Sequence, residues 1–279
     1  MSTILRIELF KIFKRPRTYI SFAAIAAIVL LIQLALYLDG GTYVQFMLQG
    51  IENTFNIDGK IMHGYLICYV ILQTLLIHVP LLIALIGGDM IAGEANMGTL
   101  RLLISKPVSR TNLLMSKFVA TASYTLLLLL WMAFLSLLVS ILAFGVGDLM
   151  IFKSEQIVIL KKSDVMWRYF AAFGFAAIAM VTVAALSFFL SLFAENSIGP
   201  IVATMSIIIV CTILTTMDLP LFNKIKPFLF TSHMLGWKGF FDDPVNYAAI
   251  FKSAAILLLH IIGFVGASVM VFRKKDILS

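Results

Sequence analysis

Residues 118–147 read FVATASYTLLLLLWMAFLSLLVSILAFGVG, which is thirty positions without an Asp, Glu, Lys or Arg. A hydrocarbon core about 30 Å thick is crossed by about 20 helical residues, so this run can span a bilayer if it tilts or protrudes. In lipid, only helices and closed barrels satisfy every backbone polar group. The alternating pattern of a barrel strand is absent from the run, which therefore predicts a transmembrane helix.

Five further runs share this lack of charge. They lie at 18–38, 61–88, 169–194, 196–217 and 253–272, and a Gly87-Gly88 pair is predicted to end the second one. The whole chain is 61% hydrophobic and 13% charged, whereas soluble domains average about 45–50% and about 25%. The sequence therefore predicts an all-α integral membrane protein whose six transmembrane helices form one domain over residues 1–279.

Charge divides unequally between the two sides that six spans define. The side that holds both ends, segment 89–117 and Glu195 carries twelve basic and five acidic residues, and the other side carries nine of each. The net charge of +7 thus falls on one face, which the positive-inside rule places in the cytoplasm. Anionic membrane lipids account for the basic balance, so no nucleic-acid partner is implied.

Residues 1–17 are predicted to form an interfacial amphipathic helix that Pro16 ends. An apolar stripe at helical spacing, opposite a basic cluster, is typical of a helix that lies along lipid headgroups. The stripe predicted to face the membrane interface consists of Leu5, Leu9, Ile12 and Phe13. A disordered basic tail is the alternative.

Two segments on the other side differ in character. Residues 148–168 carry mixed charges and predict a solvated loop. Residues 218–251 are rich in aromatic side chains and broken by Pro and Gly, so they predict short extracytoplasmic or re-entrant pieces before the sixth helix. An ordinary loop is the alternative. Trp237 is predicted to anchor this segment at the membrane interface.

Polar residues within the spans provide few candidates for chemistry. His78 and His260 are interpreted as partners in hydrogen bonds between helices, with a functional role as the alternative. Cys68 and Cys211 are interpreted as small packing residues, and the histidines lack metal-ligand spacing, so no metal site is predicted. The sequence also lacks the motifs G-x-x-x-x-G-K-[ST], H-E-x-x-H and G-x-S-x-G, so no catalytic residue is predicted.

Segment 89–117 is the long polar stretch on the basic side. Thr99 is positioned to cap a short helix over 100–105 that Pro107 ends, and Thr111 to cap the next helix. The short helix would carry an apolar stripe of Leu100, Leu103 and Ile104, with Arg101 facing elsewhere. A short amphipathic helix joined stiffly to two spans suits the transfer of force from a partner, whereas a loop that serves only topology is the alternative.

The same segment resembles the membrane subunit of ABC-2 type transporters, which have a type V exporter-like fold. The resemblance is carried by Glu94, Gly98-Thr99-Leu100, Leu103, Lys106-Pro107-Val108-Ser109-Arg110, Leu113-Leu114 and Lys117. The six spans, the basic N-terminal segment and the broken segment before the last span match as well, so the resemblance covers the whole chain.

This resemblance implies that segment 89–117 contains a cytoplasmic coupling helix that docks on a cytosolic ABC ATPase subunit. It also implies that two permease chains pair, as two copies or as homologues, in a bacterial inner membrane with both termini cytoplasmic. ATP and Mg would bind to the partner ATPase, and this chain would carry no cofactor. The implied coupling positions are Glu94, Gly98, Thr99, Leu100, Arg101, Leu103, Pro107, Arg110 and Lys117.

The favoured function is therefore the permease subunit of an ATP-driven exporter without catalytic residues of its own. A non-transporting membrane sensor or assembly partner is one alternative. A membrane-embedded lipid-modifying enzyme is another, but it needs convergent acids or histidines near one leaflet, and the acids here are dispersed. The spans are mostly Leu, Ile, Ala and Phe, which favours an amphipathic or lipid-like cargo, or energy transfer to another envelope protein.

Overall fold

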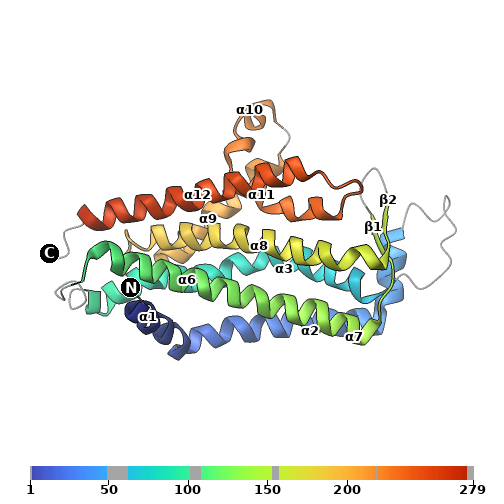
Figure 1. Cartoon of the computed structure of the whole chain (residues 1–279), viewed down its shortest axis with the longest axis horizontal. Coiled ribbons are helices and arrows are strands. Elements are labelled where there is room, and N and C mark those ends of the chain that lie inside the picture. The colour runs from blue at the N-terminus through green and yellow to red at the C-terminus, as the bar shows by residue number, and fades with distance from the viewer. Residues whose placement is uncertain (1, 49–61, 101–107, 153–156, 218, 275–279) are drawn as a thin grey trace.

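The computed structural model describes residues 2–48, 62–100, 108–152, 157–217 and 219–274. Its long helices run side by side along one axis (Figure 1). Within these described residues, six helices of 19 to 35 residues are long and apolar enough to cross a membrane. The predicted multi-pass helical architecture is confirmed at this level.

Pro16 separates the first two helices. α1 covers Ser2–Lys14 and α2 covers Pro16–Leu48. Proline has no amide hydrogen to donate and is favoured at the first position of a helix, so it can end one helix and begin the next. The N-terminal helix thus ends at Lys14, close to the proline that was predicted to stop it.

Helical structure continues past the glycine pair that was predicted to end the second span. α3 covers Gly64–Gly87, and α4 follows directly at Asp89–Asn96. Gly88 keeps the right-handed helical conformation, and its amide donates to the Ala84 carbonyl at 2.8 Å. A Cβ atom at Gly88 would lie 3.1 Å from Pro200 at the start of the fifth span. The glycine therefore permits close packing. α3 ends at Gly87, as predicted, but the chain becomes helical again at once, at Asp89.

The third span is one rod that contains a π-helical turn. Its parts are α6 (Arg110–Ala133), the π-helical turn η1 (Phe134–Val139) and α7 (Ser140–Phe144). The Ser109 hydroxyl caps the rod by accepting a hydrogen bond from the Asn112 amide at 3.2 Å. The predicted capping by Thr111 is therefore wrong, because the helix begins two residues earlier.

The segment predicted as a solvated loop after this rod forms a hairpin. β1 (Leu149–Phe152) pairs with β2 (Ile157–Leu160) in antiparallel register, and Leu149 lies opposite Leu160. The next helix, α8 (Lys162–Leu190), begins well before its predicted start. Arg168 can be buried in it because Asp164 forms an ion pair with it at 2.6 Å. The solvated-loop prediction failed because this charge is neutralised within the chain.

α8 and α9 (Ile198–Thr216) are antiparallel neighbours joined by a tight turn. In the turn, the Asn196 side-chain oxygen accepts hydrogen bonds from the amides of Ile198 and Gly199 at 3.1 Å each. This turn includes Glu195, the one residue that separates the charge-free runs 169–194 and 196–217.

Short helices precede the last span, as the sequence predicted for this region. They are α10 (Pro220–Asn223), η2 (Lys226–Phe228), α11 (Phe230–Met234) and η3 (Leu235–Phe241), and α12 (Tyr247–Lys274) follows them. Trp237 is fully buried, with its ring centroid 5.7 Å from that of Tyr69 on α3. The prediction that Trp237 anchors at the membrane interface is wrong, because η3 packs inward against α8 and α12.

α3 and α8 form the centre of the bundle. In their most apolar stretches, 56% and 61% of residues are buried, against 17% in both α9 and α12. α1 and the last turn of α12 lie at one end of the bundle, and the β-hairpin lies at the other (Figure 1). We call these the terminal end and the hairpin end.

Candidate functional site

Four charged side chains are buried together at the terminal end of the bundle. Glu8 is 2% exposed, Glu94 3%, Lys117 1% and Asp89 5%. Burying an unpaired charge is strongly unfavourable, so such groups must find partners within the chain. The arrangement of these partners defines the candidate site, which lies where α1, α4 and α6 meet.

Two lysines and two glutamates form a closed ring of ion pairs. The Lys117 Nζ atom lies 2.8 Å from Glu8 Oε2 and 2.7 Å from Glu94 Oε1. The Lys11 Nζ atom lies 2.9 Å from Glu8 Oε1 and 2.9 Å from Glu94 Oε1. Positive and negative groups alternate around the ring, so its formal charge is zero. We call these four residues the ion ring.

Contacts within the ion ring shift the pKa values of Glu8 and Lys11, the two ring residues on α1. Burial alone would raise the pKa of Glu8, but the positive charges and hydrogen bonds of Lys117 and Lys11 outweigh it and lower that pKa. Burial alone would lower the pKa of Lys11, but Glu8 and Glu94 raise it above the ordinary value. Both residues are therefore charged at neutral pH.

A second set of polar contacts surrounds Asp89 beside the ring. Arg15 and Arg17 both donate to its carboxylate, Arg17 at 3.1 Å, and the Ser197 hydroxyl donates to it as well. A Cβ atom at Gly93 would collide with the Asp89 carboxylate. Any other residue at this position would therefore force the Asp89 side chain to shift. That side chain connects α4 to the start of α2 and to the turn between α8 and α9.

The ion ring changes the interpretation of α1. Ile12 is 3% exposed, and Leu5 and Leu9 pack against the core, so the predicted membrane-facing stripe lies against the rest of the chain. Phe13 is half-buried. α1 packs chiefly on α6, because Glu8 lies on this stripe and pairs with Lys117. The outward face carries Ile7 and Phe10 instead, which are 50% and 65% exposed.

Comparison with known proteins identifies a family. A family model described as "Protein of unknown function (DUF2705)" matches residues 23–278. The chain belongs to this family. A relative in Bacillus subtilis (strain 168), named "Uncharacterized protein YhcI", is 25% identical over 199 residues. That alignment covers 69% of this chain and 63% of the relative, so it spans less than two thirds of the relative's length.

In this member of the DUF2705 family, two of the predicted coupling residues are internal. Glu94 and Lys117 belong to the ion ring and face each other inside the chain. Leu100 is also buried, at 4% exposure, whereas Leu103 and Ile104 of the predicted apolar stripe lie outside the described residues. These three residues flank or lie in the segment between α4 and α6, which we call the 97–109 loop and of which the structure describes residues 97–100 and 108–109.

The other predicted positions lie in the loop or at its edges. Gly98 has φ of +68°, which favours glycine, and the Thr99 hydroxyl donates to the Glu94 carbonyl at 3.3 Å. Arg110 donates to the Arg273 carbonyl on α12 at 3.3 Å. Arg101, Leu103 and Pro107, and the predicted helix beyond Leu100, lie outside the described residues.

Sequence reasoning missed Glu8, Lys11 and Asp89 as site residues. A signal for Glu8 was present, because the spacing from Leu5 through Glu8 to Ile12 places an acid within an apolar helical stripe. An acid in that position requires a buried cation, but the sequence does not show that Lys117 is the cation that reaches it.

The polar residues within the spans make mostly local contacts. The rings of His78 and His260 each contact a backbone carbonyl of their own helix at 2.8 Å, so the interpretation as bonds between helices is wrong. Gln33 makes such a bond instead, donating to the Leu135 carbonyl at 3.1 Å and the Ser140 hydroxyl at 2.9 Å near η1. In the described part of the chain, no group of three or more His, Cys, Asp or Glu side chains could hold a metal ion.

Proposed function

We propose that this chain is the membrane-spanning permease subunit of an ATP-driven transporter of the ABC-2 type, without catalytic residues of its own. A separate cytosolic ATPase subunit binds ATP and Mg and also binds the 97–109 loop. The motif between Glu94 and Lys117 supports this proposal, as do the six helices that can span a membrane.

The observation that carries the proposal is the ion ring at the base of the 97–109 loop. Glu94 lies just before the loop and Lys117 just after it, and their charged atoms are 2.7 Å apart. Separating a buried ion pair leaves uncompensated charges, and removing one partner typically costs about 3–5 kcal/mol. A force on the loop therefore moves α4 and α6 together and does not pull them apart.

The ring also passes this motion to α1. Glu8 and Lys11 each bond to a residue on another helix, Lys117 and Glu94 respectively. Arg15 at the following corner bonds to Asp89 on α4. Because α1 continues through Pro16 into α2, a displacement of the loop reaches the first, second and third spans.

Charge supports the orientation in this proposal. α1, which carries Glu8 and Lys11 of the ion ring, lies at the terminal end, where the excess of basic residues lies. The positive-inside rule supports a cytoplasmic location for this end. In the proposed arrangement the chain lies in a bacterial inner membrane, with this end within reach of a soluble ATPase. Two permease chains pair, and ATP-driven motion opens and closes a path between them for an amphipathic or lipid-like cargo.

A pair of matched variants tests the docking step. Val108 in the loop and Val146 near the hairpin end are 37% and 49% exposed. The chain is co-expressed with ABC ATPase subunits from the same organism, and the ATPase that co-purifies is measured. We expect Val108→Asp to lower recovery about tenfold, equivalent to about 1.4 kcal/mol, and Val146→Asp to leave it unchanged.

The same preparation tests which subunit hydrolyses ATP. The chain alone is expected to hydrolyse no ATP, and the complex in vesicles to hydrolyse it. Equal recovery of the ATPase with both variants would contradict docking at the loop. ATP hydrolysis by the isolated chain would contradict the assignment of catalysis to a partner.

A further inference from the structure

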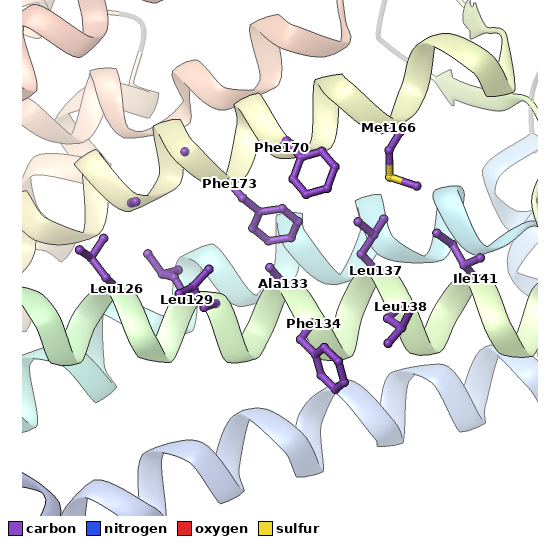
Figure 2. A pocket seen from close by; sticks show the side chains of 13 residues that line it. Leu126, Leu129, Ala133, Phe134, Leu137, Leu138, Ile141, Met166, Phe170 and Phe173 are labelled. Carbon is purple, nitrogen blue, oxygen red and sulfur yellow. The ribbon is translucent and has the colours of Figure 1, made fainter.

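A groove on the outside of the bundle runs between the third and fourth spans. Figure 2 shows its walls, with Leu126, Leu137 and Ile141 on the α6–η1–α7 rod and Met166 and Phe173 on α8. The groove has a volume of about 690 Å³, and every side chain that lines it is apolar. It lies within helices that are long and apolar enough to span a membrane, at the level of the acyl chains of a bilayer.

Small residues and the π-helical turn create this groove. Gly174 on α8 lines it, and a Cβ atom at that position would meet nothing within 4 Å. Ala133 and Ala177 also line it, and η1 contributes Phe134, Leu137 and Leu138. A π-helical turn inserts one extra residue per turn and often marks a functional position in a helix.

The dimensions of the groove discriminate between possible occupants. Leu126 and Ile141 are the outermost lining residues on the rod, and fifteen helical steps of about 1.5 Å separate them by about 22 Å. An α-helix with side chains is about 10–12 Å across, so a groove of this length and volume holds only one face of a helix. A single extended hydrocarbon chain is narrow enough to lie within the groove along its whole length.

A lysine side chain lies just beyond the groove at the hairpin end. Lys162, Met166 and Phe170 are spaced four residues apart on α8, so they share one face of the helix. Met166 and Phe170 line the groove, and Lys162 lies one turn beyond its end and is exposed. Trp167, next to Met166, is 39% exposed. Lysine and tryptophan together are typical of the level at which lipid headgroups lie.

We propose that the groove binds one acyl chain of a membrane phospholipid, with the lipid phosphate at Lys162. The apolar walls accept the chain, and the ammonium group pairs with the phosphate. The phosphate end of this site is at the hairpin end, and the groove runs along the outer surface of the rod, away from the ion ring. The inference does not depend on the proposed transport function.

The test uses a phosphatidylglycerol whose acyl chain carries a photoactivatable diazirine. The full chain is reconstituted with this probe in phosphatidylcholine vesicles, irradiated and digested, and the labelled residues are located by mass spectrometry. We expect labels to concentrate on the groove residues of η1 and α8. Equal labelling of the exposed outward face of α12 would overturn the proposal, and this comparison needs no variant.

Matched variants sharpen the result. Gly174→Leu fills the groove, and Gly266→Leu makes the same change on α12, where a Cβ atom also meets nothing within 4 Å. We expect Gly174→Leu to reduce groove labelling about tenfold, or about 1.4 kcal/mol, and Gly266→Leu to leave it unchanged. Labelling that persists in Gly174→Leu would overturn the proposal.

A second pair of variants tests the proposed contact between Lys162 and the lipid headgroup. Lys162→Gln is expected to weaken labelling by the phosphatidylglycerol probe severalfold, whereas Lys252→Gln, an exposed change on α12, is expected to have no effect. An equal effect of both variants would refute the role of Lys162. Cross-links between the groove and a second copy of the chain, in place of lipid labels, would overturn the proposal and assign the groove to a protein contact instead.

Discussion

The Nζ atom of Lys117 lies 2.7 Å from the Oε1 atom of Glu94, and both side chains are almost completely buried. These residues stand on either side of the 97–109 loop, twenty-three positions apart in the sequence. Because the pair closes the base of the loop inside the bundle, the loop is held by two helices that cannot move independently.

Removal of Lys117 is expected to destabilise the fold strongly. Lys117→Met leaves Glu8 and Glu94 buried with only the half-buried Lys11 to compensate them. We expect a loss of about 3–5 kcal/mol, as for other buried pairs that lose one partner, measured as a lower thermal midpoint in detergent. Lys252→Met, an exposed change on α12, is the control and is expected to have little effect.

A compensated variant distinguishes charge from packing in that experiment. Glu8→Gln and Glu94→Gln remove the stranded charges when they are combined with Lys117→Met. The triple variant is therefore expected to be more stable than Lys117→Met alone, since replacing a whole buried ionic group costs less than breaking it. A further loss of stability in the triple variant would contradict the ion-ring interpretation.

Acid is expected to weaken the ring through Glu8. Its folded pKa is lowered, so its contribution to stability is present above the unfolded value near 4.5 and is lost as the pH falls through the folded value. Lys11 has a raised folded pKa, so its contribution is present below about 10.5 and is lost as the pH rises through the folded value. The thermal midpoint should therefore fall as the pH is lowered from 7 to 3. The expected difference is on the order of a few degrees.

Glu8→Gln provides the control for that pH dependence. The variant should be less stable at neutral pH, because Lys117 loses one of its two carboxylates. It should also lose less stability on acidification, since the glutamine amide does not take up a proton in this pH range. An acid decline as steep as that of the unmodified chain would show that other groups cause it.

Most of the fold could be predicted from the sequence, because lipid imposes a simple rule on chain composition. Runs without charge mark the spans, and Pro16 marks the corner between α1 and α2. The rule failed where charges are neutralised within the chain. Asp89 lies in a helix because Arg15 and Arg17 neutralise its negative charge. Arg168 lies inside α8 because Asp164 neutralises its positive charge.

The candidate site was predicted only in part, for a related reason. The segment around Glu94 and Lys117 could be found from its motif, but the ring depends on Glu8, which is 109 positions from Lys117. Pairings over such distances follow from how helices pack, and composition and periodicity do not encode them. The burial of Trp237 was missed for the same reason, because its ring packs against Tyr69, which is distant in the sequence and lies on α3.

The left-handed conformation of Gly98 is expected to matter for the loop. Its φ of +68° costs a residue with a side chain about 1–2 kcal/mol, although a Cβ atom there meets nothing within 4 Å. Gly98→Ala should therefore strain the loop and reduce the amount of ATPase that co-purifies. Gly41→Ala, in helix α2 and equally free of contacts, should be neutral or stabilise by about 0.5–1 kcal/mol. Equal behaviour of the two variants would contradict a role for this turn.

The orientation of the chain can be tested by the accessibility of single cysteines. The native Cys68 and Cys211 are unpaired and are first replaced by alanine. Met97→Cys and Val146→Cys then place one thiol at each end of the bundle, at positions that are 58% and 49% exposed. In intact bacterial cells, a membrane-impermeant maleimide should label Val146→Cys directly and Met97→Cys only after the membrane is permeabilised. Labelling of Met97→Cys in intact cells would place the loop outside, where no cytosolic ATPase could reach it, and the proposed function would then be wrong.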